Sequence, residues 1–195
     1  MKDKQIVKYP LKEIMLYDGK LTGGIKYNYV MLSDKLFRPQ NFQKAFLTSP
    51  TSISGYNIEN YLSTELTYEY DKFGNILQTT DRNGIATTYV WGYGGLYLIA
   101  RIINANYTQV QTRLGVNLKT GVIAGALTSS QDTSLRGLSG CEVTTYTHSP
   151  MIGVASVKDP TGCITYYSYD NYGRLEYVRD EQNNVLEKYQ YNIKN

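Results

Sequence analysis

Cysteine and histidine are nearly absent from this sequence, which has two cysteines and one histidine among 195 residues. Two cysteines are too few for a disulfide framework. The single histidine, His148, has no Cys, His or Asp cluster at ligand spacing around it, so the common metal-site patterns are excluded. A chain of this length can bury a core without such support. We therefore expect no metal, cofactor or disulfide.

An excess of charge of one sign is also missing. Twenty Lys and Arg stand against 17 Asp and Glu, for a formal net charge of +3, and the basic residues are scattered singly. Proteins that bind nucleic acid usually gather basic residues on one face. Nucleic acid is therefore not expected as a partner.

Long hydrophobic runs are missing as well. No stretch is long and apolar enough to predict a membrane span. The first residues, MKDKQIVKYPLKEIM, have no continuous apolar segment and no small-residue cleavage site, so no signal peptide is visible. If the natural protein is exported, we expect this chain to be a mature or truncated piece of it.

Tyrosine, by contrast, is abundant, with 20 residues, and tyrosine suits half-exposed sheet faces. The tyrosines recur in a pattern. YEYDKFGNILQTTDRNG from Tyr68 and YSYDNYGRLEYVRDEQN from Tyr167 superpose without a gap. Decayed copies follow the same period of 21 residues from Tyr89 and Tyr146. A half copy holds Tyr189 and Tyr191, and Tyr27 with Tyr29 is a candidate remnant. Such self-similarity indicates a repeat architecture.

One turn type punctuates the repeat. Four segments have Asp first and Gly fourth, and a fifth has Asn in place of Gly: Asp71 to Gly74, Asp81 to Gly84, Asp159 to Gly162, Asp170 to Gly173 and Asp180 to Asn183. The Asp side chain accepts backbone N–H bonds, and Gly or Asn supplies a positive φ. This favours a type I turn with a G1 bulge in a three-residue hairpin loop. The spacing leaves strands of about six or seven residues.

These residues resemble the YD-repeat, or RHS-repeat, family, which takes its name from the Tyr-Asp pair seen here as Tyr70-Asp71 and Tyr169-Asp170. The resemblance covers roughly residues 64–103 and 141–195. The helical insertion and the ending YQYNIKN resemble the C-terminal segment of large YD-repeat proteins of Bacteroidetes. It implies a long secreted or cell-surface protein whose hairpins spiral into a hollow shell, as in polymorphic toxins, insecticidal toxin complexes and teneurins. The localisation it implies is extracellular or cell surface.

The toxin members of the family end in a self-cleaving segment and a variable toxin domain, and neither follows Asn195 here. The segment from Asp159 to Gly162 is similar to the Asp-Pro-x-Gly of that processing site. However, it lies in phase with the other turns, so we interpret it as a turn.

The remaining segments predict four stretches of one continuous domain: 1–63, 64–103, 104–140 and 141–195. The first contains a hairpin, 12–17 with 20–30, around Asp18-Gly19. A strand over 35–47 follows, with Pro39 at an edge or bulge, and then a loop over 48–63. The insertion 104–140 predicts a helix between Asn106 and Gly115 and a weaker one over 128–138.

We therefore predict a mainly β fold: an antiparallel β-meander of repeated hairpins, about ten to thirteen strands, twisted and curled, with a short helical insertion. Cys141 and Cys163 open strands that lie two apart, about 9.6 Å from each other. That exceeds the roughly 7 Å Cα limit of a disulfide, so we expect free thiols. The two edge strands are expected to pair with the remainder of a larger repeat protein or with a second copy, or to be covered by the insertion.

Three functions remain open from the sequence. The first is a non-catalytic scaffold, in which the turn aspartates are structural. The second is a carbohydrate-binding module that uses exposed aromatic rings, with Trp91 and Tyr93 as candidates. The third is a glycoside hydrolase, which needs two carboxyls about 5 to 10 Å apart in a pocket. We favour the scaffold, because every turn position already requires its Asp, and His148 replaces a repeat tyrosine in a packing position.

Overall fold

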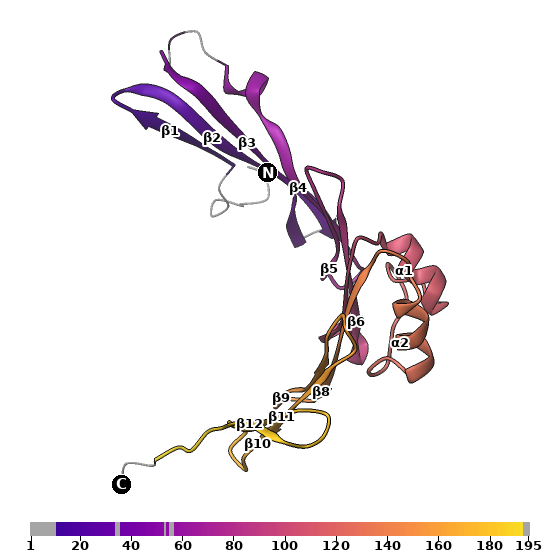
Figure 1. The fold of residues 1–195 in the computed structure, drawn as a ribbon. Helices are drawn as coiled ribbons and strands as arrows, with labels where there is room; N and C mark the ends of the chain where they lie inside the picture. Colours follow the sequence, from indigo (N-terminus) through magenta and orange to yellow (C-terminus); the bar gives the residue numbers. More distant parts are fainter. Residues whose placement is uncertain (1–10, 34–35, 53, 55–56, 193–195) are drawn as a thin grey trace. The chain divides into compact units, whose positions relative to one another are not determined.

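The computed structural model describes residues 11–33, 36–52, 54 and 57–192 (Figure 1). Twelve strands form an antiparallel sheet in which each strand neighbours the next in sequence, from β1 to β12. The predicted antiparallel meander with a short helical insertion is therefore confirmed. By its contacts the chain divides into two compact units, Met1–Ala86 and Thr87–Asn195.

The first unit begins with the predicted hairpin. Asp18 and Gly19 both have a positive φ, 48° and 67°, as a two-residue type I′ turn requires. The elements of this unit are β1 (Lys12–Tyr17), β2 (Lys20–Ser33), β3 (Leu36–Thr51), the 3-10 helix η2 (Ile58–Tyr61), β4 (Ser63–Tyr70) and β5 (Ile76–Asp81).

Strand β3 is longer than expected. It extends to Thr51, so the loop predicted from Thr48 starts later and contains η2. Pro39 lies opposite Tyr29, next to a shift in the register of β2 and β3, which places it at the bulge that a proline inside a sheet needs. Ile58 of η2 packs with Leu21 and Ala45 in a small buried cluster.

The second unit carries the insertion. Its elements are β6 (Ala86–Gly92), the 3-10 turn η3 (Tyr93–Gly95), β7 (Tyr97–Ile103), α1 (Tyr107–Leu114), α2 (Ser129–Arg136), β8 (Glu142–Ser149), β9 (Gly153–Lys158), β10 (Ile164–Tyr169), β11 (Leu175–Arg179) and β12 (Val185–Lys188). Both predicted helices are present. Asn106 and Thr128 cap them through capping boxes, and Gly115 ends α1 with a φ of 67°.

The helices lie on one side of the strands of this unit (Figure 1). The most deeply buried side chains include Val90, Ile99, Ile102, Val110 and Leu135. They come from β6, β7, α1 and α2, so the insertion supplies part of the core. Thr88 is also buried, and its Oγ1 donates to the carbonyl of Ala105 at 2.8 Å, as a buried hydroxyl should.

An ionic network attaches α2 to the sheet. Asp132 accepts hydrogen bonds from Arg136 Nε (3.1 Å), Lys158 Nζ (2.7 Å) and Thr145 Oγ1 (3.1 Å). Arg136 Nη1 also donates to the carbonyl of Asp159 at 2.7 Å. Burial alone would raise the pKa of Asp132, but the bond from Lys158 and the nearby Arg136 outweigh it and lower that pKa.

Cys141 and Cys163 immediately precede β8 and β10, and β9 pairs with both of these strands. This is the strand order from which free thiols were expected, and both cysteines are free. Within the described residues, no helix has the length and apolar character needed to cross a membrane.

Candidate functional site: turns and ladder-end bonds

The turn at Asp71 shows the geometry that the repeat uses. Gly74 N–H donates to the carbonyl of Asp71 at 3.1 Å, and Asp71 N–H donates to the carbonyl of Asn75 at 3.0 Å. The Asp71 carboxylate accepts from the N–H groups of Phe73 and Asn75, both at 2.9 Å. This is a type I turn followed by a residue with positive φ, the G1-bulge arrangement.

The other four segments have the same bonds. In each, the N–H of the fourth residue donates to the carbonyl of the Asp, at 2.9 to 3.1 Å. Each Asp carboxylate also accepts from the backbone N–H groups two and four residues later. The fourth residues, Gly74, Gly84, Gly162, Gly173 and Asn183, have φ between 66° and 98°.

These bonds hold three carboxylates in their charged form. The pKa of Asp159 is lowered chiefly by the Thr161 hydroxyl, that of Asp170 by the Arg174 backbone N–H, and that of Asp180 by the Asn184 side chain. Each carboxylate is thus engaged with its own turn. The turns at Asp159 and Asp170 lie at opposite ends of β10, so these two carboxyls do not form the close pair that glycoside hydrolysis needs.

Acid should therefore weaken the turns. A carboxyl whose pKa is lower in the folded state stabilises the fold above its unfolded pKa, near 4, and loses that contribution as the pH falls through the folded pKa. We expect the urea midpoint of the chain to fall steeply below about pH 4. In a variant with Asp159, Asp170 and Asp180 all replaced by asparagine, the same midpoint should vary less with pH. Equal pH dependence in the two proteins would contradict this.

A second repeated feature lies where paired strands separate. In three Tyr-x-Tyr motifs, the second tyrosine donates its hydroxyl to a carbonyl of the preceding strand. Tyr70 donates to Pro39 at 2.6 Å, Tyr169 to Val154 at 2.8 Å and Tyr191 to Leu175 at 2.8 Å. We call these the ladder-end bonds.

The ladder-end bonds occupy one position in the register. The pairs Thr67↔Asn41, Tyr166↔Ser156 and Lys188↔Tyr177 lie at the end of their ladders. In all three, the bonding tyrosine comes three residues after the first member of the pair (67 + 3, 166 + 3, 188 + 3). The accepting carbonyl comes two residues before the second member (41 − 2, 156 − 2, 177 − 2). The phenol thus satisfies a carbonyl that the strand ladder no longer reaches.

His148 follows the same rule with a different side chain. The pairing of β8 with β7 ends at Thr145↔Ala100, and His148 Nε2 lies 2.7 Å from the carbonyl of Leu98. His148 is thus three residues after Thr145, and Leu98 is two residues before Ala100. The imidazole takes the place of the phenol as donor, which requires the proton on Nε2. Tyr97 stacks on its ring at 4.9 Å and Tyr93 meets it edge-on at 5.8 Å.

Burial raises the pKa of two of these tyrosine hydroxyls. Desolvation, followed by the neighbouring Tyr68, raises the pKa of Tyr70 to about 12. Desolvation and Tyr167 likewise raise that of Tyr169. These hydroxyls therefore remain protonated donors across the neutral range. The sequence contained the signal for this feature, since the second tyrosine is among the residues that the two best copies share, but a single motif does not show which carbonyl accepts its hydrogen bond.

Removing one ladder-end hydroxyl should cost about 1 kcal/mol, because a half-buried carbonyl loses its donor. We expect Tyr169→Phe to lower the free energy of unfolding by that amount in urea titrations. Tyr167→Phe is the matched control, since no hydrogen bond of the Tyr167 hydroxyl is found among the described residues and Tyr167 lies two residues away on the same strand. His148→Tyr should be tolerated and His148→Phe should not. Equal losses in the two Tyr→Phe variants would contradict the assignment.

Trp91 and Tyr93, the candidates for ring stacking, are both half-buried. Trp91 lies within β6, opposite Leu98 of β7. Tyr93 has a φ of 51°, and its ring contacts Tyr97 and His148. Tyr93 is therefore part of the packing around the His148 bond. Among the residues that the structure describes, no three His, Cys, Asp or Glu side chains gather as a metal site would need.

The fold is similar to parts of much longer chains of known structure. A crystal structure of TcdB2-TccC3-Cdc42 matches with a TM-score of 0.56 at 17% identity, over 88% of this chain and 7% of that chain. A Photorhabdus luminescens Tc holotoxin pore matches with a TM-score of 0.57 at 16% identity, over the same shares. No family model and no curated protein matches. These likenesses support an RHS-like β fold, and the chain spans about 7% of the length of either match.

Proposed function

We propose that the chain is a non-catalytic structural scaffold, a segment of a secreted or cell-surface YD/RHS-repeat protein that serves as shell or interaction platform. One observation carries the proposal: the ladder-end bonds and the Asp turns recur at fixed register positions. Both devices connect strands that are neighbours in the sheet. In this scaffold the stretches 64–103 and 141–195 would act as one array, interrupted by the insertion 104–140.

The fold likeness supports this proposal. The matched structures are parts of larger assemblies, TcdB2-TccC3-Cdc42 and a Tc holotoxin pore. A chain in such an assembly needs sheet edges that accept further strands. Both terminal strands, β1 and β12, pair on one side only within the described residues, which leaves backbone groups for that purpose.

A scaffold of repeats should accept an extra repeat. The unit from Ile164 to Asn184 comprises β10, β11 and their turns, and a tandem copy could follow Asn184 without changing the phase. Because each repeat contacts only its neighbours, the lengthened chain should fold and be at least as stable to urea. As a control, the same 21 residues in scrambled order at the same place should destabilise the protein. A duplicate that unfolds the chain would refute the scaffold.

The proposed location is tested separately. In cells that make the full-length protein, an antibody against this segment should label intact cells or the culture medium. Labelling only after permeabilisation would refute the extracellular assignment while leaving the scaffold role open.

A further inference from the structure

Strand β12 presents an open backbone edge. All four of its residues, Val185–Lys188, are exposed. Among the described residues, β12 pairs with β11 along one of its sides only. Beyond β12 the chain stays alongside β11, because Tyr189 N–H donates to the carbonyl of Glu176 at 2.9 Å and Tyr191 makes its ladder-end bond to Leu175. Within the described residues, the outer edge of β12 therefore remains free to bind another strand.

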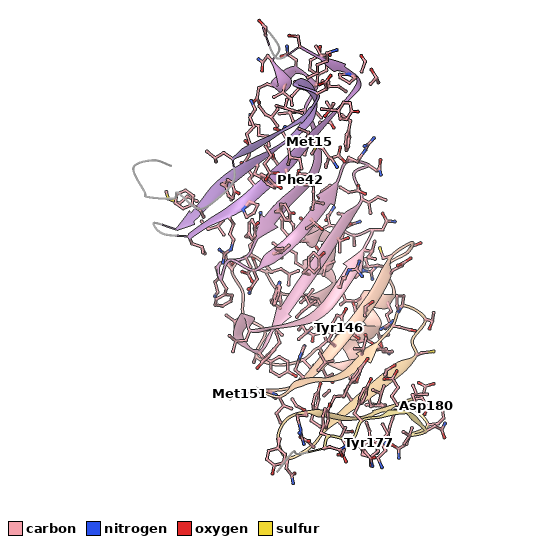
Figure 2. All side chains as sticks on the ribbon, turned by 90° about the vertical axis from the view of Figure 1, so that its left-hand side faces the viewer. Met15, Phe42, Tyr146, Met151, Tyr177 and Asp180 are labelled. Carbon is pink, nitrogen blue, oxygen red and sulfur yellow. The ribbon has the colours of Figure 1, made fainter. Side chains whose placement is uncertain are left out.

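Two cations beside this edge have no ion pair with an acidic side chain among residues 11–33, 36–52, 54 and 57–192. Arg179 lies over the ring of Tyr177 at 4.3 Å, and Lys188 lies over the same ring at 5.5 Å. Tyr177 pairs directly with Lys188, so the three side chains share one face of the sheet. Arg179 Nη1 donates to Ser168 Oγ at 3.1 Å. No ion pair of either cation is found among the described residues. Figure 2 labels Tyr177 on these strands.

Three other basic side chains of this unit form ion pairs with carboxylates. Lys158 and Arg136 share Asp132, and Arg174 pairs with Asp170 at 2.8 Å. The nearest acid in sequence to Lys188 is Glu187, but it lies opposite Val178 and so projects to the other face. Arg179 and Lys188 thus form a positive site around an aromatic ring, directly beside an open edge.

A second copy of β12 does not supply the missing charge. In an antiparallel pair related by a two-fold axis, residues directly opposite each other project to the same face. Glu187 and Lys188 are adjacent and project to opposite faces, so Glu187 of one copy never lies opposite Lys188 of the other. Self-pairing through β12 leaves both cations unmatched.

We propose that this edge binds an extended acidic segment of another polypeptide. The segment would add a strand to β12 by backbone hydrogen bonds, with acidic side chains at alternate positions facing Tyr177, Arg179 and Lys188. The inference rests on the proposed scaffold function and names the chemistry of the strand that the scaffold accepts. Main-chain bonds supply affinity, and the two cations select for carboxylates.

The test uses the whole chain and fluorescent peptides of about nine residues, which alternate valine with glutamate or valine with lysine. Fluorescence anisotropy at low salt should show at least tenfold tighter binding of the glutamate peptide, and salt should weaken it. Lys188→Glu should abolish or reverse the preference. Lys72→Glu, in the β4–β5 turn of the first unit, should leave it unchanged.

Several outcomes would overturn the inference. They are equal affinity for the two peptides, no binding of either, or an unchanged preference in Lys188→Glu. Binding of a glutamate peptide of the same composition but without alternation would show charge attraction without strand addition. Displacement by a sulfated polysaccharide at equal charge concentration would point to a glycan instead. Because the repeat-duplication experiment does not involve this edge partner, a failure here leaves the scaffold proposal standing.

Discussion

Replacing Gly92 by alanine is expected to lower the free energy of unfolding by about 3 kcal/mol, as overpacking of a tight site does. A Cβ on Gly92 would lie 2.2 Å from the carbonyl oxygen of Gly125 and 2.7 Å from Cγ2 of Ile99. Ile99 is fully buried, so its side chain has no room to move away. The loop of the insertion around Gly125 would have to leave β6.

Displacement of this loop has a second consequence. Gly94 N–H donates to the carbonyl of Ile123 at 3.0 Å, so the turn between β6 and β7 would lose its contact with the insertion. Urea titration followed by circular dichroism measures the loss. Gly125→Ala is the matched control, because a Cβ there meets nothing within 4 Å. If both variants lost equal stability, close packing at Gly92 would not be the cause.

The repeat made most of the second unit predictable. An Asp that accepts two backbone N–H groups and a Gly or Asn at positive φ are local requirements, so Asp170 and Gly173 indicate their turn without knowledge of the rest of the chain. The same holds for the caps of α1, where Asn106 and Gly115 fix the helix ends. These features depend on residues a few positions apart, which a pattern can reveal.

Contacts between distant residues were not predictable in the same way. The ladder-end bond of Tyr70 reaches Pro39, 31 positions earlier. The motif around Tyr70 therefore cannot indicate which carbonyl accepts the bond. His148 was expected to pack, whereas its Nε2 also meets the carbonyl of Leu98. The ionic network of Asp132 likewise joins α2 to β8 and β9 through residues 13 and 26 positions apart.

The candidate binding residues also differed in whether local sequence or distant contacts determine their surroundings. Tyr93 was a candidate for an exposed aromatic ring that binds carbohydrate. In the structure Tyr93 is half-buried, and its ring meets that of His148 edge-on. By contrast, no sequence pattern indicates that Arg179 and Lys188 contact the same ring. Their position beside Tyr177 follows from the register of β11 and β12.

The second large effect is expected at Leu135, the buried residue of α2. Its side chain is fully buried, together with Val110 of α1 and Ile99 and Ile102 of β7. Leu135→Ala removes three carbon atoms and leaves a cavity, which costs about 3 kcal/mol at comparable sites. The loss should appear in urea titration, and amide hydrogen exchange should accelerate in both helices because α1 packs against α2.

Leu96→Ala makes the same chemical change at a position that is 74% exposed, and it should alter stability by less than about 0.5 kcal/mol. The comparison separates two roles of the insertion. If α2 is held mainly by burial, Leu135→Ala will loosen it even though the bonds from Asp132 to Lys158 and Thr145 remain possible. The opposite result is that amide hydrogen exchange in α2 is unchanged in Leu135→Ala and rises only in Asp132→Asn. In that case the ionic network holds the helix, and charge attaches the insertion to the scaffold more than burial of Leu135 does.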